Sequence, residues 1–379
     1  MLADALPRII PFFGMLFLVF CSWLMSSNRR RFPWRIVLVG IALQYALAAL
    51  VMLTIPGRQF FELANQAVAG LQSFVTAGSG MVFGLPESAA QAVGDSQFLL
   101  KSFALGVLPT VIVFSSLMAV LYHVGIMQWI VRGFAWVMQR TMGTSGPETL
   151  AAAANIFVGH TEAPLVIRPY LEKLSRSELN ALMVGGFATV TGSLVAAYAD
   201  LGAQAGHIVT ASVISAPAAL LIAKILEPER DDYITSETLS VATGLTKTNL
   251  IGAATQGASD GLKLALNIAA MLIAFLALLA MADWAVGQLG WWLGFQDVDG
   301  QPTLTVSAML AVAFRPIAFL IGIPWQETVA AGELLGLKMF ANEFVAFQRL
   351  GEMLDSSEPI SERTRHIMTY ALCGFSNFA

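Results

Sequence analysis

Charged residues are scarce in this sequence of 379 residues, and cysteine is scarcer still. Only 12% of the residues are charged and 56% are hydrophobic, whereas a soluble domain has about 25% charged residues. The net charge of -4 comes without a basic block, so nucleic acid is not expected as a partner. Cys21 and Cys373 lie far apart in apolar surroundings and support neither a disulfide framework nor a metal site. This composition predicts an all-α polytopic (multi-pass) protein in a lipid bilayer.

Long apolar runs predict the transmembrane helices. They cover Ile9–Met25, Ile36–Leu53, Phe98–Val124, Leu179–Tyr198, His207–Leu226 and Leu262–Met281. Arg29, Arg30 and Arg31 follow the first run, so the positive-inside rule places this end in the cytoplasm and the N-terminus outside. The stretch Phe60–Leu85 is amphipathic and predicts helices that lie along the membrane interface.

A carboxylate interrupts the stretch Asn155–Leu171, which reads NIFVGHTEAPLVIRPYL. Glu162 lies between Gly159 and Pro164, which are both helix breakers. A carboxylate near the bilayer centre costs about 2.5–3.5 kcal/mol. Irregular backbone at that depth is tolerated only where protein or a water-filled cavity satisfies it. We therefore predict a re-entrant helical hairpin within Gly146–Leu174 whose tip lines a polar cavity.

The pattern of a hairpin followed by a broken helix occurs twice. The predicted helix Leu179–Tyr198 is interrupted by the hydroxyl-rich Thr189–Ser193. Later in the chain, Thr305–Phe347 contains a second carboxylate, Glu327, in GIPWQETVA, and a break follows at Cys373–Asn377. Paired interrupted segments in two halves of a chain predict the binding site of a secondary transporter.

Four motifs give the sequence a likeness to a known family. They are NIFVGHTEAPLVIRPYL, GIPWQE, ANEFVAF from Ala341 to Phe347, and the terminal CGFSNF. In this order they resemble the concentrative nucleoside transporters, a family of sodium/nucleoside cotransporters, from Leu100 onward. The resemblance implies a homotrimer whose protomers each hold a scaffold and a mobile transport domain of two re-entrant hairpins and two broken helices.

The resemblance also implies the site residues, position by position. The nucleobase would contact His160, Thr161, Glu162 and Leu194. The ribose would contact Glu327, Phe375 and Asn377. A sodium ion would be held by the side chains of Asn155 and Thr189 and by the carbonyls of Val158 and Val190. Glutamine is more common in the family at the position of His160, so the preference for purines or pyrimidines stays open.

This likeness divides the chain into four parts. Residues 1–125 supply the first three transmembrane helices and the interfacial helices of the scaffold, and 126–226 form the first half of the transport domain. Residues 227–300 contain a connecting loop and a scaffold helix, and 301–379 form the second half of the transport domain. The family continues past CGFSNF with a further serine, the rest of the broken helix and another span. We therefore expect the second half to be C-terminally incomplete in this chain.

The function implied is sodium-coupled import of nucleosides across a bacterial inner (plasma) membrane, with sodium as coupling ion and no organic cofactor. Coupling to a proton carried by Glu162, Glu343 or His160 is the first alternative, and a non-transporting remnant is another. An intramembrane enzyme acting on a nucleoside-like substrate is disfavoured because HExxH, GxSxG and aspartyl-pair motifs are absent. Structural roles at hairpin tips remain the alternative for Glu162 and Glu327, and equally for Glu343.

Overall fold

The computed structural model describes residues 2–83, 103–159, 163–229, 249–294, 304–354, 356 and 359–377. Helices dominate these residues, and no strand occurs among them. The prediction of an all-α chain is therefore confirmed. The chain packs as two compact units, and each is best considered separately.

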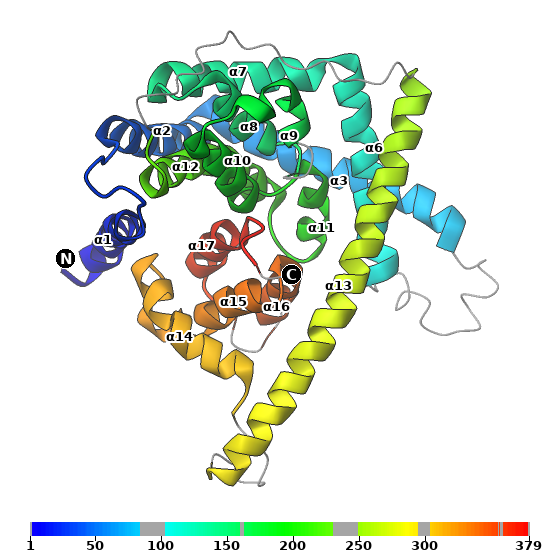
Figure 1. The fold of residues 1–379 in the computed structure, drawn as a ribbon. Coiled ribbons are helices and arrows are strands. Elements are labelled where there is room, and N and C mark those ends of the chain that lie inside the picture. Colours follow the sequence, from blue (N-terminus) through cyan, green and yellow to red (C-terminus); the bar gives the residue numbers. More distant parts are fainter. Residues whose placement is uncertain are drawn as a thin grey trace. The chain divides into compact units, whose positions relative to one another are not determined.

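The larger unit comprises residues 25–200 and 204–267. Its elements are α2 (Trp34–Leu53), α3 (Ile55–Phe83), η1 (Phe103–Val107), α6 (Leu108–Val124), α7 (Ile126–Met142), α8 (Gly146–Asn155), α9 (Ala163–Val166), η2 (Arg168–Lys173), α10 (Arg176–Ala188), η3 (Gly192–Leu194), α11 (Val195–Asp200) and α12 (Ala205–Leu226). Helix α12 contacts α2, α3, α8 and α10 (Figure 1). Most of α12 is buried in the unit, which explains why it is apolar on all sides.

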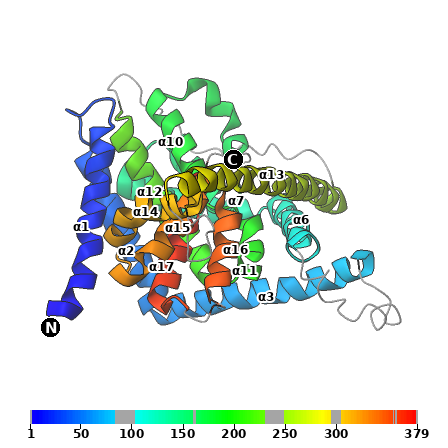
Figure 2. The same ribbon diagram turned by 90° about the horizontal axis from the view of Figure 1, so that it is seen from below.

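The smaller unit comprises residues 1–24, 201–203 and 268–379. Its elements are α1 (Leu2–Leu24), α14 (Val306–Leu320), η4 (Trp325–Glu327), α15 (Thr328–Phe340), α16 (Glu343–Leu354) and α17 (Glu362–Leu372). Helix α15 lies beside α14, α16 and α17 (Figure 2). A Cβ on Gly332 would lie 2.3 Å from the Ala311 carbonyl oxygen, and one on Gly336 would lie 2.4 Å from Leu310 Cβ. The two glycines therefore let α15 approach α14 closely, as small residues do between membrane helices.

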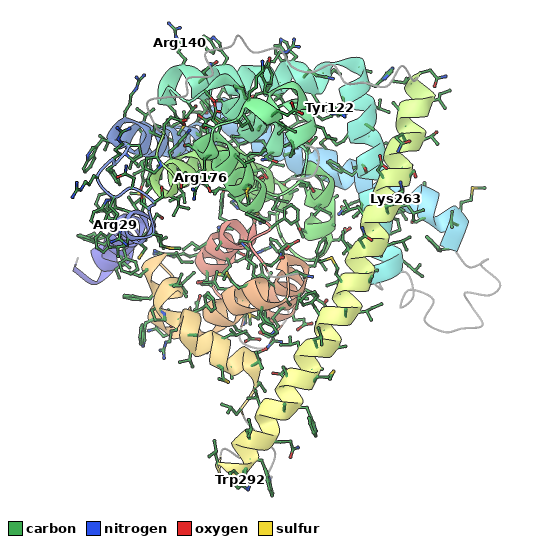
Figure 3. The ribbon with its side chains drawn as sticks, in the orientation of Figure 1. Arg29, Tyr122, Arg140, Arg176, Lys263 and Trp292 are labelled. Atoms are coloured by element: carbon green, nitrogen blue, oxygen red, sulfur yellow. The ribbon has the colours of Figure 1, made fainter. Side chains whose placement is uncertain are left out.

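Four of the described helices are long and apolar enough to cross a membrane. They cover Trp34–Leu53, Leu105–Val124, Ala205–Leu226 and Leu250–Trp292. These match four predicted spans, although residues 98–102 of the third predicted span lie outside the described part. The last is α13 (Leu250–Trp292), which continues beyond its predicted ends and carries Trp292 at its C-terminal end (Figure 3). The apolar part of α1 is shorter and covers Ile9–Leu24.

Of the amphipathic stretch predicted at Phe60–Leu85, the described part up to Phe83 belongs to one helix, α3, of 29 residues. It begins earlier than predicted, at Ile55, and Pro56 lies in its first turn. Proline is accommodated there since the first N–H groups of a helix have no intrahelical acceptor. Thr54 alone separates α3 from α2, so the chain turns sharply between them.

One end of the larger unit carries the arginine-rich turn that precedes α2. The Ser27 amide donates to the Leu226 carbonyl at 2.9 Å, which places the C-terminal end of α12 beside this turn. The Arg35 guanidinium carbon lies 3.3 Å from a Cβ built on Gly143, directly after α7. The ends of α7 and α12 therefore lie on the side of Arg29–Arg31, the side that the positive-inside rule assigns to the cytoplasm.

A buried charge network joins the N-terminal ends of α8 and α10 to the C-terminal end of α12. Lys224 Nζ lies 2.6 Å from Glu148 Oε2 and 2.5 Å from Glu229 Oε2. The same ammonium donates to Ser177 Oγ at 3.0 Å, and Ser175 Oγ donates to Glu229 Oε1 at 2.8 Å. Lys224 and Glu148 are each 2% exposed. The network fixes the ends of three helices relative to one another.

Removing the ammonium with Lys224→Met should destabilise the protein by about 3–5 kcal/mol, because buried carboxylates lose their counterion. The matched control is Lys263→Met. Lys263 projects from α13 (Figure 3) and pairs with Asp260 at 3.7 Å while 71% exposed, so its loss should cost at most about 1 kcal/mol. Thermal unfolding in detergent, followed by circular dichroism, measures both, and equal shifts in Tm would contradict the expected difference.

Candidate functional site

The backbone leaves the helical conformation directly after α10. Ala188 ends that helix, and Thr189 is extended with φ -115° and ψ 157°. Thr191 is also extended, with φ -69° and ψ 142°, before the short η3 and then α11 begin. The interruption falls within the predicted segment Thr189–Ser193. Backbone groups in this break cannot form the usual helical hydrogen bonds and need other partners.

The connection that follows α8 reaches this break directly. The Gly192 amide donates to the Phe157 carbonyl oxygen at 3.0 Å. A Cβ on Gly192 would lie 2.7 Å from that same oxygen, so a side chain here would collide with the backbone. Glycine is therefore required where the end of α8 and the break after α10 meet.

The amide of Asn155, the last residue of α8, is the most unusual polar group in this region. Asn155 is 1% exposed, and neither Oδ1 nor Nδ2 has a hydrogen-bond partner among the described residues. Its Nδ2 lies 3.1 Å from a Cβ built on Gly185. The Gly185 carbonyl in turn accepts from Thr189 Oγ1 at 2.8 Å. A buried amide without partners is costly, so its oxygen is suited to bind a cation that prefers hard oxygen ligands.

The structure places the other residues predicted for this half as follows. Leu194 ends η3 and is 2% exposed, and Val158 and Val190 are buried on either side of the Phe157–Gly192 contact. His160, Thr161 and Glu162 lie outside the described residues. The predicted sodium ligands Asn155, Val158, Thr189 and Val190 therefore come from the two segments that this contact joins.

In the smaller unit, α17 ends at Leu372 where the sequence predicts a break. Cys373 is extended, with φ -63° and ψ 127°. Gly374 then adopts φ +118°, a conformation that side chains other than glycine rarely allow. The backbone N–H of Asn377 donates to the Phe375 carbonyl at 3.0 Å, so the segment after the break is a tight turn.

The carboxylate that meets this turn belongs to Glu343. Asn377 Nδ2 donates to Glu343 Oε2 at 2.6 Å, and Glu343 is 3% exposed. Glu343 begins α16 after a sharp change at Ala341, which has φ -97° and ψ -94°. Asn342 Oδ1 accepts from the Val345 amide at 3.0 Å, as a helix N-cap does. The helical turn between α15 and α16 therefore reaches the break after α17.

Glu327, the carboxylate that the sequence predicts for the ribose, bonds to the start of α17 in this structure. It lies in the turn between α14 and α15 and accepts from Ser361 Oγ at 2.9 Å and from the Ser361 amide at 3.3 Å. Ser361 is the N-cap of α17, at the opposite end of that helix from Cys373. The sequence predicts that Glu327 and Asn377 both contact the ribose. In this structure their side chains have different hydrogen-bond partners, Ser361 and Glu343. Glu343 was the residue that the sequence left without a definite role.

The fold and the two breaks define a class. Membrane-crossing helices combined with interrupted helices, whose breaks meet buried polar groups, are typical of polytopic membrane proteins that bind ligands at depth. Three family descriptions match the chain: Na+ dependent nucleoside transporter N-terminus at residues 13–85, nucleoside recognition at 104–205, and Na+ dependent nucleoside transporter C-terminus at 207–379. The chain belongs to the Na+-dependent nucleoside transporter family, which is a family of transporters and not of enzymes.

Relatives with curated sequences agree with this membership. Solute carrier family 28 member 3 of Eptatretus stoutii is 40% identical over 385 residues, which cover 98% of this chain and 54% of that protein. Sodium/nucleoside cotransporter 1 of Mus musculus is 39% identical over 388 residues, covering 98% and 57%. The chain thus spans about half the length of these relatives. An uncharacterized transporter of Haemophilus influenzae is 38% identical, with 97% of this chain and 85% of the relative covered.

Solved structures of CNTnw share the fold. CNTnw in an inward-facing substrate-bound state has a TM-score of 0.86 and 38% identity, with 98% of this chain and 86% of that chain covered. A doubly substituted CNTnw in an outward-facing state has a TM-score of 0.90 and 37% identity, with 99% and 87% covered.

The hydrogen bond between Asn377 and Glu343 can be tested by a double-mutant cycle. Asn377→Ala and Glu343→Gln should each lower the unfolding free energy, and the pair should show a coupling of about 1.5–3 kcal/mol because the acceptor is a buried carboxylate. Unfolding of the four proteins in mixed micelles measures the coupling. Strictly additive effects would mean that the two side chains do not interact.

Proposed function

We propose that this protein imports nucleosides across the cell inner (plasma) membrane and couples their entry to inward movement of sodium. The observation that carries the proposal is the buried amide of Asn155, which has no partner among the described residues and lies beside Gly185 in the last turn of α10. Family membership supplies the substrate class, and the amide supplies the place where an ion would bind. Each further step below builds on these two supports.

The sodium ion is held, in this proposal, by the side chains of Asn155 and Thr189 and by the carbonyls of Val158 and Val190. An amide oxygen, a hydroxyl and carbonyls freed by interrupted helices are the hard ligands that sodium takes in secondary transporters. The ion would satisfy the Asn155 oxygen and would tie the end of α8 to the start of the α10 break. The two segments are also joined directly by the hydrogen bond from the Gly192 amide to the Phe157 carbonyl.

Sodium entry can supply the energy that accumulation needs. One positive charge that crosses about 100 mV releases about 2.3 kcal/mol. A tenfold concentration gradient adds about 1.4 kcal/mol. One ion per nucleoside is therefore enough, by itself, for concentration by several hundredfold.

For the nucleoside, we propose one set of contacts for the base and one for the sugar. His160, Thr161, Glu162 and Leu194 contact the base in this proposal. Phe375 and Asn377 contact the sugar, and the carboxylate that accepts from its hydroxyls is Glu343 in preference to Glu327. The Asn377 to Glu343 hydrogen bond supports this choice, whereas Glu327 is engaged by Ser361. When the nucleoside binds, a sugar hydroxyl would replace Asn377 Nδ2 as the hydrogen-bond donor to Glu343.

The membrane arrangement follows from helix lengths. Helix α8 has 10 residues, or about 15 Å, half of the roughly 30 Å hydrocarbon core. It starts at the end of the unit that carries the arginines, so we propose that it enters from the cytoplasm and stops at mid-depth. This is the re-entrant hairpin that the sequence predicts. The proposal includes a homotrimer, as the family resemblance implies.

The first test is uptake of radiolabelled uridine and adenosine into proteoliposomes at fixed pH. Replacing sodium with choline should abolish accumulation. Asn155→Ala should raise the sodium concentration for half-maximal uptake by at least about tenfold, because a direct ligand is lost. The control is Asn267→Ala, since Asn267 is an exposed amide on α13. Uptake that persists in choline and follows an imposed proton gradient would replace sodium coupling with proton coupling.

The second test separates the two carboxylates of the smaller unit. Glu343→Gln should raise the uridine KM by about tenfold or more, because a hydrogen-bonding acceptor for the sugar is lost. Glu327→Gln should change KM by less than about threefold while lowering Tm, because it weakens a helix cap. A larger KM effect at Glu327 than at Glu343 would return the sugar contact to Glu327.

A further inference from the structure

Lys338 is a buried cation that no ligand assignment above uses. It lies in the last turn of α15 and is 6% exposed. Its Nζ donates to the Ala371 carbonyl at 2.9 Å and to the Cys373 carbonyl at 3.5 Å. Among the described residues this ammonium forms hydrogen bonds with these two backbone carbonyls and no ion pair. An ammonium buried against backbone carbonyls needs an explanation, because burying a charge is costly.

The carbonyls that Lys338 contacts are those at the broken end of α17. Ala371 is in the last turn of that helix, and Cys373 is the residue at which the chain becomes extended. The final carbonyls of a helix lack intrahelical donors and carry a partial negative charge. Lys338 therefore neutralises and orients the backbone at the point where the chain turns toward Phe375 and Asn377.

In the larger unit a buried polar side chain also lies near a helix break, but that side chain is neutral. There, a buried polar side chain in the last turn of a helix, Asn155 of α8, also faces a broken helix, but it carries no charge and has no described partner. The proposed sodium ion would supply the positive charge at that break. In the smaller unit the corresponding charge is covalently attached, as the ammonium of Lys338.

We propose that Lys338 is a positioning residue: a built-in cation that holds the broken end of α17 so that Asn377 meets Glu343 and the sugar end of the nucleoside. The inference rests on the proposed function and deepens it. Lys338 acts through the backbone of Ala371 and Cys373 and does not touch the substrate.

The test compares Lys338→Met and Lys338→Arg with the exposed control Lys263→Met in proteoliposome uptake. Lys338→Met should raise the uridine KM by about tenfold and lower the preference for uridine over 2′-deoxyuridine and 3′-deoxyuridine by about fivefold or more. Lys338→Arg should keep the uridine KM and the preference for uridine close to those of the unsubstituted protein, because a guanidinium can donate to the same carbonyls. Sodium-dependent thermal stabilisation without nucleoside should be unchanged in Lys338→Met, because the ion site lies in other segments.

Hydrogen exchange gives a second readout that does not need transport. Amides of residues 372–377 should exchange faster in Lys338→Met than in Lys338→Arg or Lys263→Met, with the rest of the chain unchanged. A folded Lys338→Met protein that keeps both the sugar preference and the exchange pattern would overturn the inference. So would a loss of sodium-dependent stabilisation in step with the loss of uptake, since that indicates general damage. If the unsubstituted protein moves no nucleoside, the proposed function fails, while exchange confined to residues 372–377 would still support the Lys338 contact.

Discussion

The need to satisfy backbone groups where a helix stops governs this structure. Such groups lack intrahelical partners, so where a break is buried they must be met by other protein groups or by an ion. After α10, the connection from α8 meets the break through the Gly192 to Phe157 hydrogen bond. After α17, the ammonium of Lys338 and the turn between α15 and α16 meet it. The polar residues of the candidate site are the ones that solve this problem.

The charge network at Lys224 helps to position the first break, although it lies at the opposite ends of α8 and α10. Helices α8 and α10 both start at this network and both end at the first break, since Glu148 and Ser177 lie in their first turns while Asn155 and Thr189 lie at their other ends. A fixed start and a fixed helical rise determine where each helix ends. The relative position of the proposed sodium ligands is therefore set by contacts about 15–20 Å away.

The sequence predicted four of the long apolar helices and the positions where α10 and α17 end, because these depend on local features: apolar length, glycine, proline and clustered hydroxyls. It could not decide which carboxylate faces the second break. Glu327 lies between α14 and α15 and Glu343 lies at the start of α16, and in the sequence both positions suit a hairpin tip. The choice depends on how α17 packs against α15 and α16, a contact between segments about 30 residues apart. The Asn342-Glu343 pair directly after a helix was the available signal, and it reads equally well as an ordinary N-cap.

The two breaks differ in where their positive charge comes from, and this difference bears on coupling. A ligand shifts an equilibrium only by its differential affinity for the two states. In the smaller unit, the cation is part of the chain, as the ammonium of Lys338 that donates to the carbonyls of Ala371 and Cys373. In the larger unit, the side chain of Asn155 has no partner among the described residues, and the proposed sodium ion would provide one. In the proposed mechanism, sodium would therefore order the end of α8, and a nucleoside base that contacts this region would bind more tightly after the ion. The difference between a mobile and an attached cation would then make substrate binding depend on sodium.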